Sequence, residues 1–308
     1  MKARVHFARG WEQAMQQRQA ALGIIGGSGL YSLGSLTNVE VVEVETPWGK
    51  PSEPMRIGEI GGQTVAFLSR HGAGHRLTPS EIPYAANVCA MKMIGVSRLV
   101  SISAVGSLRE DYPPRSFVVP DGTIDRTLGR QRSFFDRGIV AHVSIADPFC
   151  PDLSSVLAGV ASSGGLPVNA GGTYIAIEGP QFSTRAESAL FRSWGASVIG
   201  MTAMPEARLA REAELCYACL AMVTDYDVWH EQDGPVTVDA VLANLHAMTD
   251  AVQTIVTALA AEALPECRAG CGSALANAIA TSLGAIDDAT RERLEPIAGR
   301  YLEPGHTA

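Results

Sequence analysis

The chain has 308 residues, of which 46% are hydrophobic and 18% charged, a length and composition that allow one large core. Its formal net charge of −8 excludes the basic surface of a nucleic-acid-binding protein, so any anionic ligand must be held by a local site. The apolar runs are shorter than the ~20 residues that span a bilayer, and the polar beginning lacks the hydrophobic region of a signal peptide. We therefore expect a soluble, cytoplasmic protein without a membrane partner.

Strand-like and helix-like patterns alternate along most of the chain. Apolar runs predict strands at 22–27, 39–45, 55–60, 63–69, 99–105, 171–177, 196–201 and 215–224. Helical periodicity predicts helices at 82–95, 186–194, 205–213 and 238–263. This alternation predicts an α/β fold whose sheet is covered by helices on both faces. We expect an N-terminal extension (1–20), a main domain (21–264) and a C-terminal helical tail (265–308) that could pack on a neighbouring subunit.

The six cysteines form no obvious framework in the sequence. Cys216 and Cys219 make a C-x-x-C pair inside the apolar run 215–224, where we expect buried, inert thiols. Cys267 and Cys271 flank a glycine-containing turn that could hold a local disulfide or a metal ion, but no nearby pair of His or Cys completes a zinc set. We expect reduced thiols and no metal.

Two polar turns follow predicted strands near the N-terminus. The turn 26–29 (GGSG) could bind an anion through backbone N–H groups and Ser28, although for these residues alone a plain tight turn is the better explanation. Its spacing does not match a dinucleotide fingerprint, a Walker A loop or a nucleophile elbow. Arg70 and His71 follow the strand 63–69 and offer donors suited to phosphate oxygens. A metal pair of His71 and His75 is disfavoured by the glycines between them, and a solvated surface loop is the other alternative.

Small and aromatic residues follow two further strands. Ser103 and Ala104 lie at the end of the strand 99–105, and open α/β sheets bind ligands beyond the carboxyl ends of their strands. The loop 178–185 (EGPQFSTR) contains Phe182, which could stack on a flat base. Ser183 or Thr184 in the same loop is expected to cap the following helix.

Asp225 and Asp227 end the strand 215–224 in the sequence TDYD. Their i, i+2 spacing directs both carboxylates to the same side. Two close carboxylates in a partly dry cleft do not ionise together readily, so one is expected to keep its proton near neutral pH. Such a pair can donate to one nitrogen and accept from an amine, as the N7 and 6-amino groups of adenine require. A solvated turn is the alternative.

In this order, the segments resemble the trimeric purine nucleoside phosphorylase family, and within it the members that cleave 5′-methylthioadenosine. The resemblance covers about 22–259 and is carried by GIIGGSGLY, SRHGAGH, SISAVGSLRE, DRTLGRQRSFFD, ADPFCP, IEGPQFSTRAES, GMTAMPEARLARE and VTDYDVW. It implies a nucleoside phosphorylase-like α/β fold with a mixed central sheet flanked by helices, with 21–264 as the catalytic domain. It also implies a homotrimer with active sites at subunit interfaces, and no metal or organic cofactor, inorganic phosphate being a co-substrate.

The resemblance also assigns roles to residues at matching positions. A phosphate site is implied for Ser28, Arg70, His71, Ser103, Ala104 and Thr202. Asp225 is implied as the acid that protonates N7 of the leaving purine, and Asp227 as the acceptor from its 6-amino group. A nucleoside site is implied for Phe182, Ser183, Met201, Val238, Val241, Leu242 and, from the adjacent subunit, His142.

The implied reaction is phosphorolysis of 5′-methylthioadenosine to adenine and 5-methylthioribose 1-phosphate. The apolar 5′ pocket fits a methylthio group better than a hydroxyl, and the first Asp of TDYD stands where relatives selective for 6-oxopurines typically have Asn. Ser28 and Ser103 stand where close relatives often carry Thr, which keeps the hydroxyl. The alternatives are a broader phosphorylase acting on adenosine or methylthioinosine, a hydrolase that uses water, and a non-catalytic nucleoside-binding protein.

Overall fold

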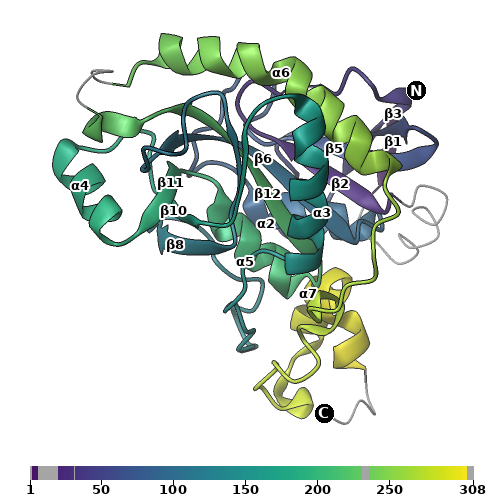
Figure 1. Cartoon of the computed structure of the whole chain (residues 1–308). Helices are drawn as coiled ribbons and strands as arrows, with labels where there is room; N and C mark the ends of the chain where they lie inside the picture. The colour runs from purple at the N-terminus through teal and green to yellow at the C-terminus, as the bar shows by residue number, and fades with distance from the viewer. Residues whose placement is uncertain (1, 6–19, 31, 231–235, 304–308) are drawn as a thin grey trace.

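The computed structural model describes residues 2–5, 20–30, 32–230 and 236–303 (Figure 1). Most of the predicted N-terminal extension lies outside these residues. None of the helices within the described ranges is long and apolar enough to cross a membrane.

A 12-stranded mixed sheet forms the centre of the protein. The main path runs in the order β1-β3-β4-β5-β2-β6-β11-β10-β8, and β12, β7 and β9 branch from β6. The strands are β1 (Lys2–Val5), β2 (Leu22–Gly26), β3 (Thr37–Val44), β4 (Met55–Ile60), β5 (Gln63–Ser69), β6 (Arg98–Ser107), β7 (Phe117–Val119), β8 (Gly122–Arg126), β9 (Val168–Ala170), β10 (Thr173–Ile177), β11 (Ala196–Gly200) and β12 (Cys216–Asp225).

Strand β6 is the point at which the sheet divides. It pairs in parallel with β2 as far as Ile102, and antiparallel with β11 from Gly106 onward. On its other edge it pairs in parallel with β12 along most of its length. Ser103 therefore lies inside β6 and does not end its strand as we expected. Between Ile102 and Gly106, β6 has left β2 and has not yet met β11, so the backbone edge there is available to a ligand.

Helices cover both faces of the sheet, as the sequence predicted. They are α2 (Tyr84–Met93), α3 (Pro151–Ala161), α4 (Arg185–Ser193), α5 (Ala203–Glu212), α6 (Val238–Ala261) and α7 (Asp288–Leu302), with short 3₁₀ helices η2 (Ser162–Gly164), η3 (Asp227–Trp229), η4 (Cys271–Ser273) and η5 (Leu283–Ala285). Along β12, Tyr217, Cys219 and Ala221 pack in one core with α2, α5 and α7, while the alternate residues pack in a second core with α3 and α6. This period of two is that of a strand buried on both faces.

The segment after Leu264 packs on its own chain. Leu294, Ile297 and Tyr301 of α7 belong to the same core as α2 and α5. The buried carboxylate of Glu214 accepts hydrogen bonds from the Tyr301 hydroxyl (2.7 Å) and from the backbone N–H of Leu275 (3.1 Å). The tail is thus part of the folded unit (Figure 1).

We expected no nearby pair of His or Cys to complete a zinc set with Cys267 and Cys271, but the fold brings two other cysteines to them. Cys150 is the N-cap residue of α3, and Cys216 is the first residue of β12. The fold places these two sulfur atoms beside those of Cys267 and Cys271, so that the four lie within 4.8 Å of one another. Cys219 points to the opposite face of β12, which separates it from its C-x-x-C partner.

Candidate active site

A cavity of about 480 Å³ lies beside β6, between the part of this strand that pairs with β2 and the part that pairs with β11, and close to the end of β12. All the predicted site residues except His142 line it: Ser28, Arg70, His71, Ser103, Ala104, Phe182, Ser183, Met201, Thr202, Asp225, Asp227, Val238, Val241 and Leu242. The parallel strands β5, β2, β6 and β12 bring their carboxyl ends to this side of the sheet, and the antiparallel strand β11 ends against β6 beside them. His142 is exposed elsewhere, and its backbone N–H donates to the Ala278 carbonyl (2.8 Å).

Arg70 lies at the polar end of the cavity, but its guanidinium group points to an acidic residue, Glu206, that the sequence analysis did not identify. Its Nε and Nη2 donate to the two carboxylate oxygens of Glu206 at 2.8 and 3.0 Å, and both side chains are fully buried. Nη2 also donates to the Ser101 hydroxyl (2.7 Å), and Nη1 donates to the Ile102 carbonyl (3.2 Å). Only Nη1 keeps an N–H for a phosphate oxygen. Arg70 therefore contributes a fixed positive charge and one hydrogen bond, not a two-pronged clamp.

His71 contributes a neutral ring. Its Nδ1 lies 2.9 Å from the Leu77 carbonyl, and because a carbonyl only accepts, Nδ1 carries the proton. Burial, aided by the charge of Arg70, lowers the pKa of His71 to about 4. The ring stacks on His75, with centroids 4.2 Å apart. At neutral pH, Nε2 is therefore unprotonated, so it accepts a hydrogen bond and does not donate one.

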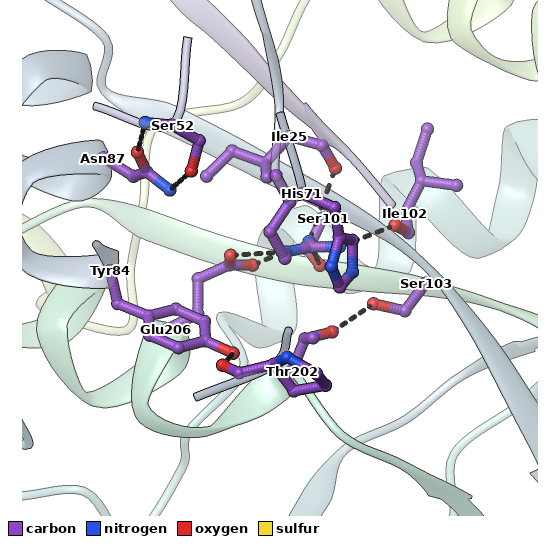
Figure 2. Close-up of polar contacts among 12 residues, drawn as sticks. Ile25, Ser52, His71, Tyr84, Asn87, Ser101, Ile102, Ser103, Thr202 and Glu206 are labelled. Atoms are coloured by element: carbon purple, nitrogen blue, oxygen red, sulfur yellow. Dashed lines mark hydrogen bonds and ion pairs between the residues drawn. The ribbon is translucent and has the colours of Figure 1, made fainter. Parts of the chain in front are cut away.

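Small hydroxyl side chains complete the polar end. The Ser103 and Thr202 hydroxyls lie 3.1 Å apart and point toward one another (Figure 2). Gly27 brings the backbone of the first turn close to this pair: a Cβ there would lie 2.6 Å from the Ile102 carbonyl oxygen and 2.9 Å from Arg70 Nη1. Only glycine allows this close approach, which places Ser28 beside Arg70 in the cavity wall.

Asp225 and Asp227 form the acidic end of the cavity. Asp225 Oδ1 accepts the backbone N–H of Asp227 (2.8 Å), and Oδ2 accepts the Thr224 hydroxyl (2.7 Å), so this carboxyl group is fixed in orientation. Burial raises the pKa of Asp225, and these two hydrogen bonds oppose the rise. Burial, together with the nearby charge of Asp225, raises the pKa of Asp227 to about 6. Asp227 Oδ2 is buried without a hydrogen-bond partner among the described residues, which leaves an acceptor for a ligand.

The loop before α4 shapes the base region. Thr184 caps α4: its hydroxyl accepts the Glu187 backbone N–H (3.2 Å), and Glu187 accepts the Thr184 backbone N–H (2.8 Å), a complete capping box. The cap is therefore Thr184, and Ser183 is left to line the cavity. Phe182 stands at the rim, 44% exposed.

The first two turns of α6 form an apolar wall. Val238, Val241, Leu242 and Leu245 lie at i, i+3, i+4 and i+7, which places them on one face of the helix. Leu245 and His75 were not predicted, although the helical period of the first three residues points to Leu245.

The family of the chain is shown by comparison with known proteins. A model of the phosphorylase superfamily matches residues 21–261. The S-methyl-5′-thioadenosine phosphorylases of Chloroflexus aurantiacus and Koribacter versatilis are 53% and 51% identical to this chain over 283 and 285 residues. Each alignment covers 92% of this chain, and they cover 98% and 97% of the two relatives.

Solved structures agree with this result. A methylthioadenosine phosphorylase from an antarctic soil metagenomic library has a TM-score of 0.85 and 47% identity, covering 91% of this chain and 99% of its own. The methylthioadenosine phosphorylase of Schistosoma mansoni, solved in complex with adenine, has a TM-score of 0.78 and 33% identity, covering 88% and 100%. The chain belongs to the phosphorylase superfamily.

Proposed function

We propose that this protein cleaves 5′-methylthioadenosine with inorganic phosphate, releasing adenine and 5-methylthioribose 1-phosphate. The observation that carries the proposal is a single cavity with three different walls. One is cationic and hydroxyl-rich around Arg70, one holds the carboxyl groups of Asp225 and Asp227, and one is the apolar face of α6. Relatives that are about 50% identical to this chain are named for this activity, and one solved relative was determined in complex with adenine.

The phosphate subsite holds the nucleophile below the sugar. Arg70 supplies the fixed positive charge, and the Ser28, Ser103 and Thr202 hydroxyls supply hydrogen bonds. Hydrogen phosphate keeps one O–H, and the unprotonated Nε2 of His71 accepts it, which orients the remaining oxygens toward C1′. A phosphate oxygen then forms a bond to C1′ as the C1′–N9 bond breaks, and the electron pair of that bond stays on adenine.

The acidic end assists departure of the base. Asp225, with its raised pKa, gives its proton to N7 as negative charge develops on the purine. The unpartnered Oδ2 of Asp227 accepts from the 6-amino group. The proton given to N7 stabilises charge that grows only as the bond breaks, which is the requirement for a gain in turnover, and the contact with Asp227 orients the base.

The apolar wall selects the 5′ substituent. A 5′-hydroxyl facing Val241 and Leu242 would lose its water without a replacement hydrogen bond, at a cost of about 1–3 kcal/mol. A methylthio group carries no such penalty. This contrast favours methylthioadenosine over adenosine.

The experiment follows adenine release by chromatography from 5′-methylthioadenosine, with and without phosphate. Phosphate-dependent release supports the proposal, and equal release without phosphate would show a hydrolase. Asp225→Asn should lower turnover by about 10²–10⁴-fold while phosphate still protects the protein against thermal unfolding. Turnover close to that of the unmodified protein would remove Asp225 from the role of acid.

We further propose that the enzyme is a cytoplasmic homotrimer in which His142 of a neighbouring copy closes the 5′ end of the cavity. Supporting this, Val238 and Leu242 leave an apolar rim 61% and 39% exposed in the single chain. The described cysteines are all free, as in a reducing compartment. Light scattering should give three times the chain mass of 32.5 kDa. An active monomer would contradict the trimer.

A further inference from the structure

Four cysteine thiols from three separate parts of the chain meet outside the cavity. Cys150 caps α3, Cys216 begins β12, and Cys267 and Cys271 lie in the segment that follows α6. Three of them are buried and Cys267 is half-buried. None lines the active-site cavity. Burial alone is ordinary for free cysteine, so the distances between the four sulfur atoms decide what they can do.

The spacing of the sulfur atoms matches metal ligation and not disulfide bonding. All four lie within 4.8 Å of one another, and Cys150 Sγ and Cys267 Sγ are 3.8 Å apart. A disulfide requires about 2.05 Å between sulfur atoms. Four sulfur atoms at about 2.3 Å from a tetrahedral zinc ion lie about 3.8 Å from each other.

The surroundings provide the support that such a site needs. Arg211 Nη1 lies 3.1 Å from Cys271 Sγ, so a cation balances part of the −2 charge of a zinc tetrathiolate. Gly270 adopts φ +67°, which lets the loop turn sharply between Cys267 and Cys271. The Arg268 backbone N–H donates to Asp152 Oδ2 (2.7 Å), and its guanidinium pairs with the same carboxylate, which fastens this loop to the start of α3.

We propose that Cys150, Cys216, Cys267 and Cys271 form a structural tetrathiolate site for Zn²⁺. Binding converts the four thiols to thiolates, releases their protons to solvent and changes no oxidation state. Four protein ligands leave no open position, so the ion has a structural role. It joins the segment after Pro265 to the beginning of β12 and to α3, and thereby holds the tail that carries α7 against the catalytic domain.

The test begins with metal content. Protein purified without a metal-binding tag or chelator should contain about one zinc ion per chain by plasma mass spectrometry. After the zinc is removed, added Co²⁺ should give the visible bands of tetrahedral cobalt and an intense near-ultraviolet sulfur-to-cobalt band. Removal should also lower the midpoint of thermal unfolding. Both readouts are independent of enzymatic activity.

Cys267→Ala removes the half-buried ligand. Cys219→Ala is the control, because it also removes one thiol, but from the face of β12 opposite to Cys216 and the proposed site. The first should lose most of the zinc and the cobalt spectrum, and the second should keep both. Metal-free protein that gives no cobalt spectrum would overturn the proposal. Three other results would also overturn it: an intact mass that shows disulfides by the loss of two hydrogens each, iron bound in place of zinc, or a Cys267→Ala protein that contains as much zinc as the parent.

Discussion

Glu206→Gln tests whether the charge of Arg70 is held by a single buried partner. The substitution keeps the size of the side chain and removes the negative charge opposite the guanidinium. Both partners are fully buried and 2.8 Å apart, so Arg70 would be left as an uncompensated buried cation. Breaking a buried pair in this way costs about 3–5 kcal/mol. We therefore expect the free energy of unfolding to fall by about that amount, measured by urea denaturation without phosphate.

Asp111→Asn is the matched control. It breaks an ion pair of similar length, 2.7 Å from Arg109, but the two side chains are 47% and 61% exposed, so the loss should be at most about 1 kcal/mol. Phosphate provides a second readout, because a bound anion replaces part of the missing charge. Saturating phosphate should therefore raise the unfolding midpoint of Glu206→Gln more than that of the unmodified protein. A Glu206→Gln protein within about 1 kcal/mol of the parent would refute this account of Arg70.

Three further substitutions test other parts of the site. Thr184→Ala removes the hydroxyl that caps α4 and should cost about 1 kcal/mol in urea denaturation, and an unchanged midpoint would contradict the role of the capping box. Gly200→Ala places a methyl group 2.6 Å from Tyr174 Cζ and in contact with its hydroxyl, so it should cost about 1–3 kcal/mol, part of which Tyr174→Phe should restore. The pKa of Asp227 is raised from 3.8 to about 6 in the native state. Between these two pH values, the native state therefore binds a proton that the unfolded state has lost. The free energy of unfolding should then fall by up to about 3 kcal/mol as the pH rises from about 4 to about 6. Asp227→Asn should remove this component, and identical pH profiles would show that Asp227 does not titrate there.

Much of the fold and of the candidate site could be predicted because the informative residues follow buried strands. Ser28, Arg70 and Asp225 come directly after, or at the end of, runs whose period marks them as strands. In an α/β sheet such positions meet at one edge, so a shared cavity follows from the pattern of elements. The resemblance to the family implied Val238, Val241 and Leu242 of the apolar wall, and their helical spacing agrees with a position on one face of α6.

Pairings between distant segments could not be predicted in this way. Glu206 lies near the start of the helical pattern 205–213, and nothing local indicates that it meets Arg70, 136 residues away. The proton position on His71 depends on the Leu77 carbonyl, which is set by the path of a loop. The sulfur atoms of Cys150 and Cys267 lie close together although 117 residues separate them in the sequence. The C-x-x-C spacing instead suggests that Cys216 pairs with Cys219. Local periodicity reports which face of an element is buried, but not which side chain it meets.

The residues that line the cavity are spread from Gly27 to Leu245, so the last of them lies about four-fifths of the way along the chain. A fragment that ends before β12 lacks the acidic end and the apolar wall, because β2, β6 and β12 must pair before the polar and acidic ends face each other. During synthesis, the protein therefore gains affinity for its ligands in one late step, after most contacts between distant residues have formed. A ligand that binds this cavity stabilises the whole native fold and no partly folded form. Adenine or phosphate added during refolding should accordingly raise the final yield of native protein without changing the rates of early collapse.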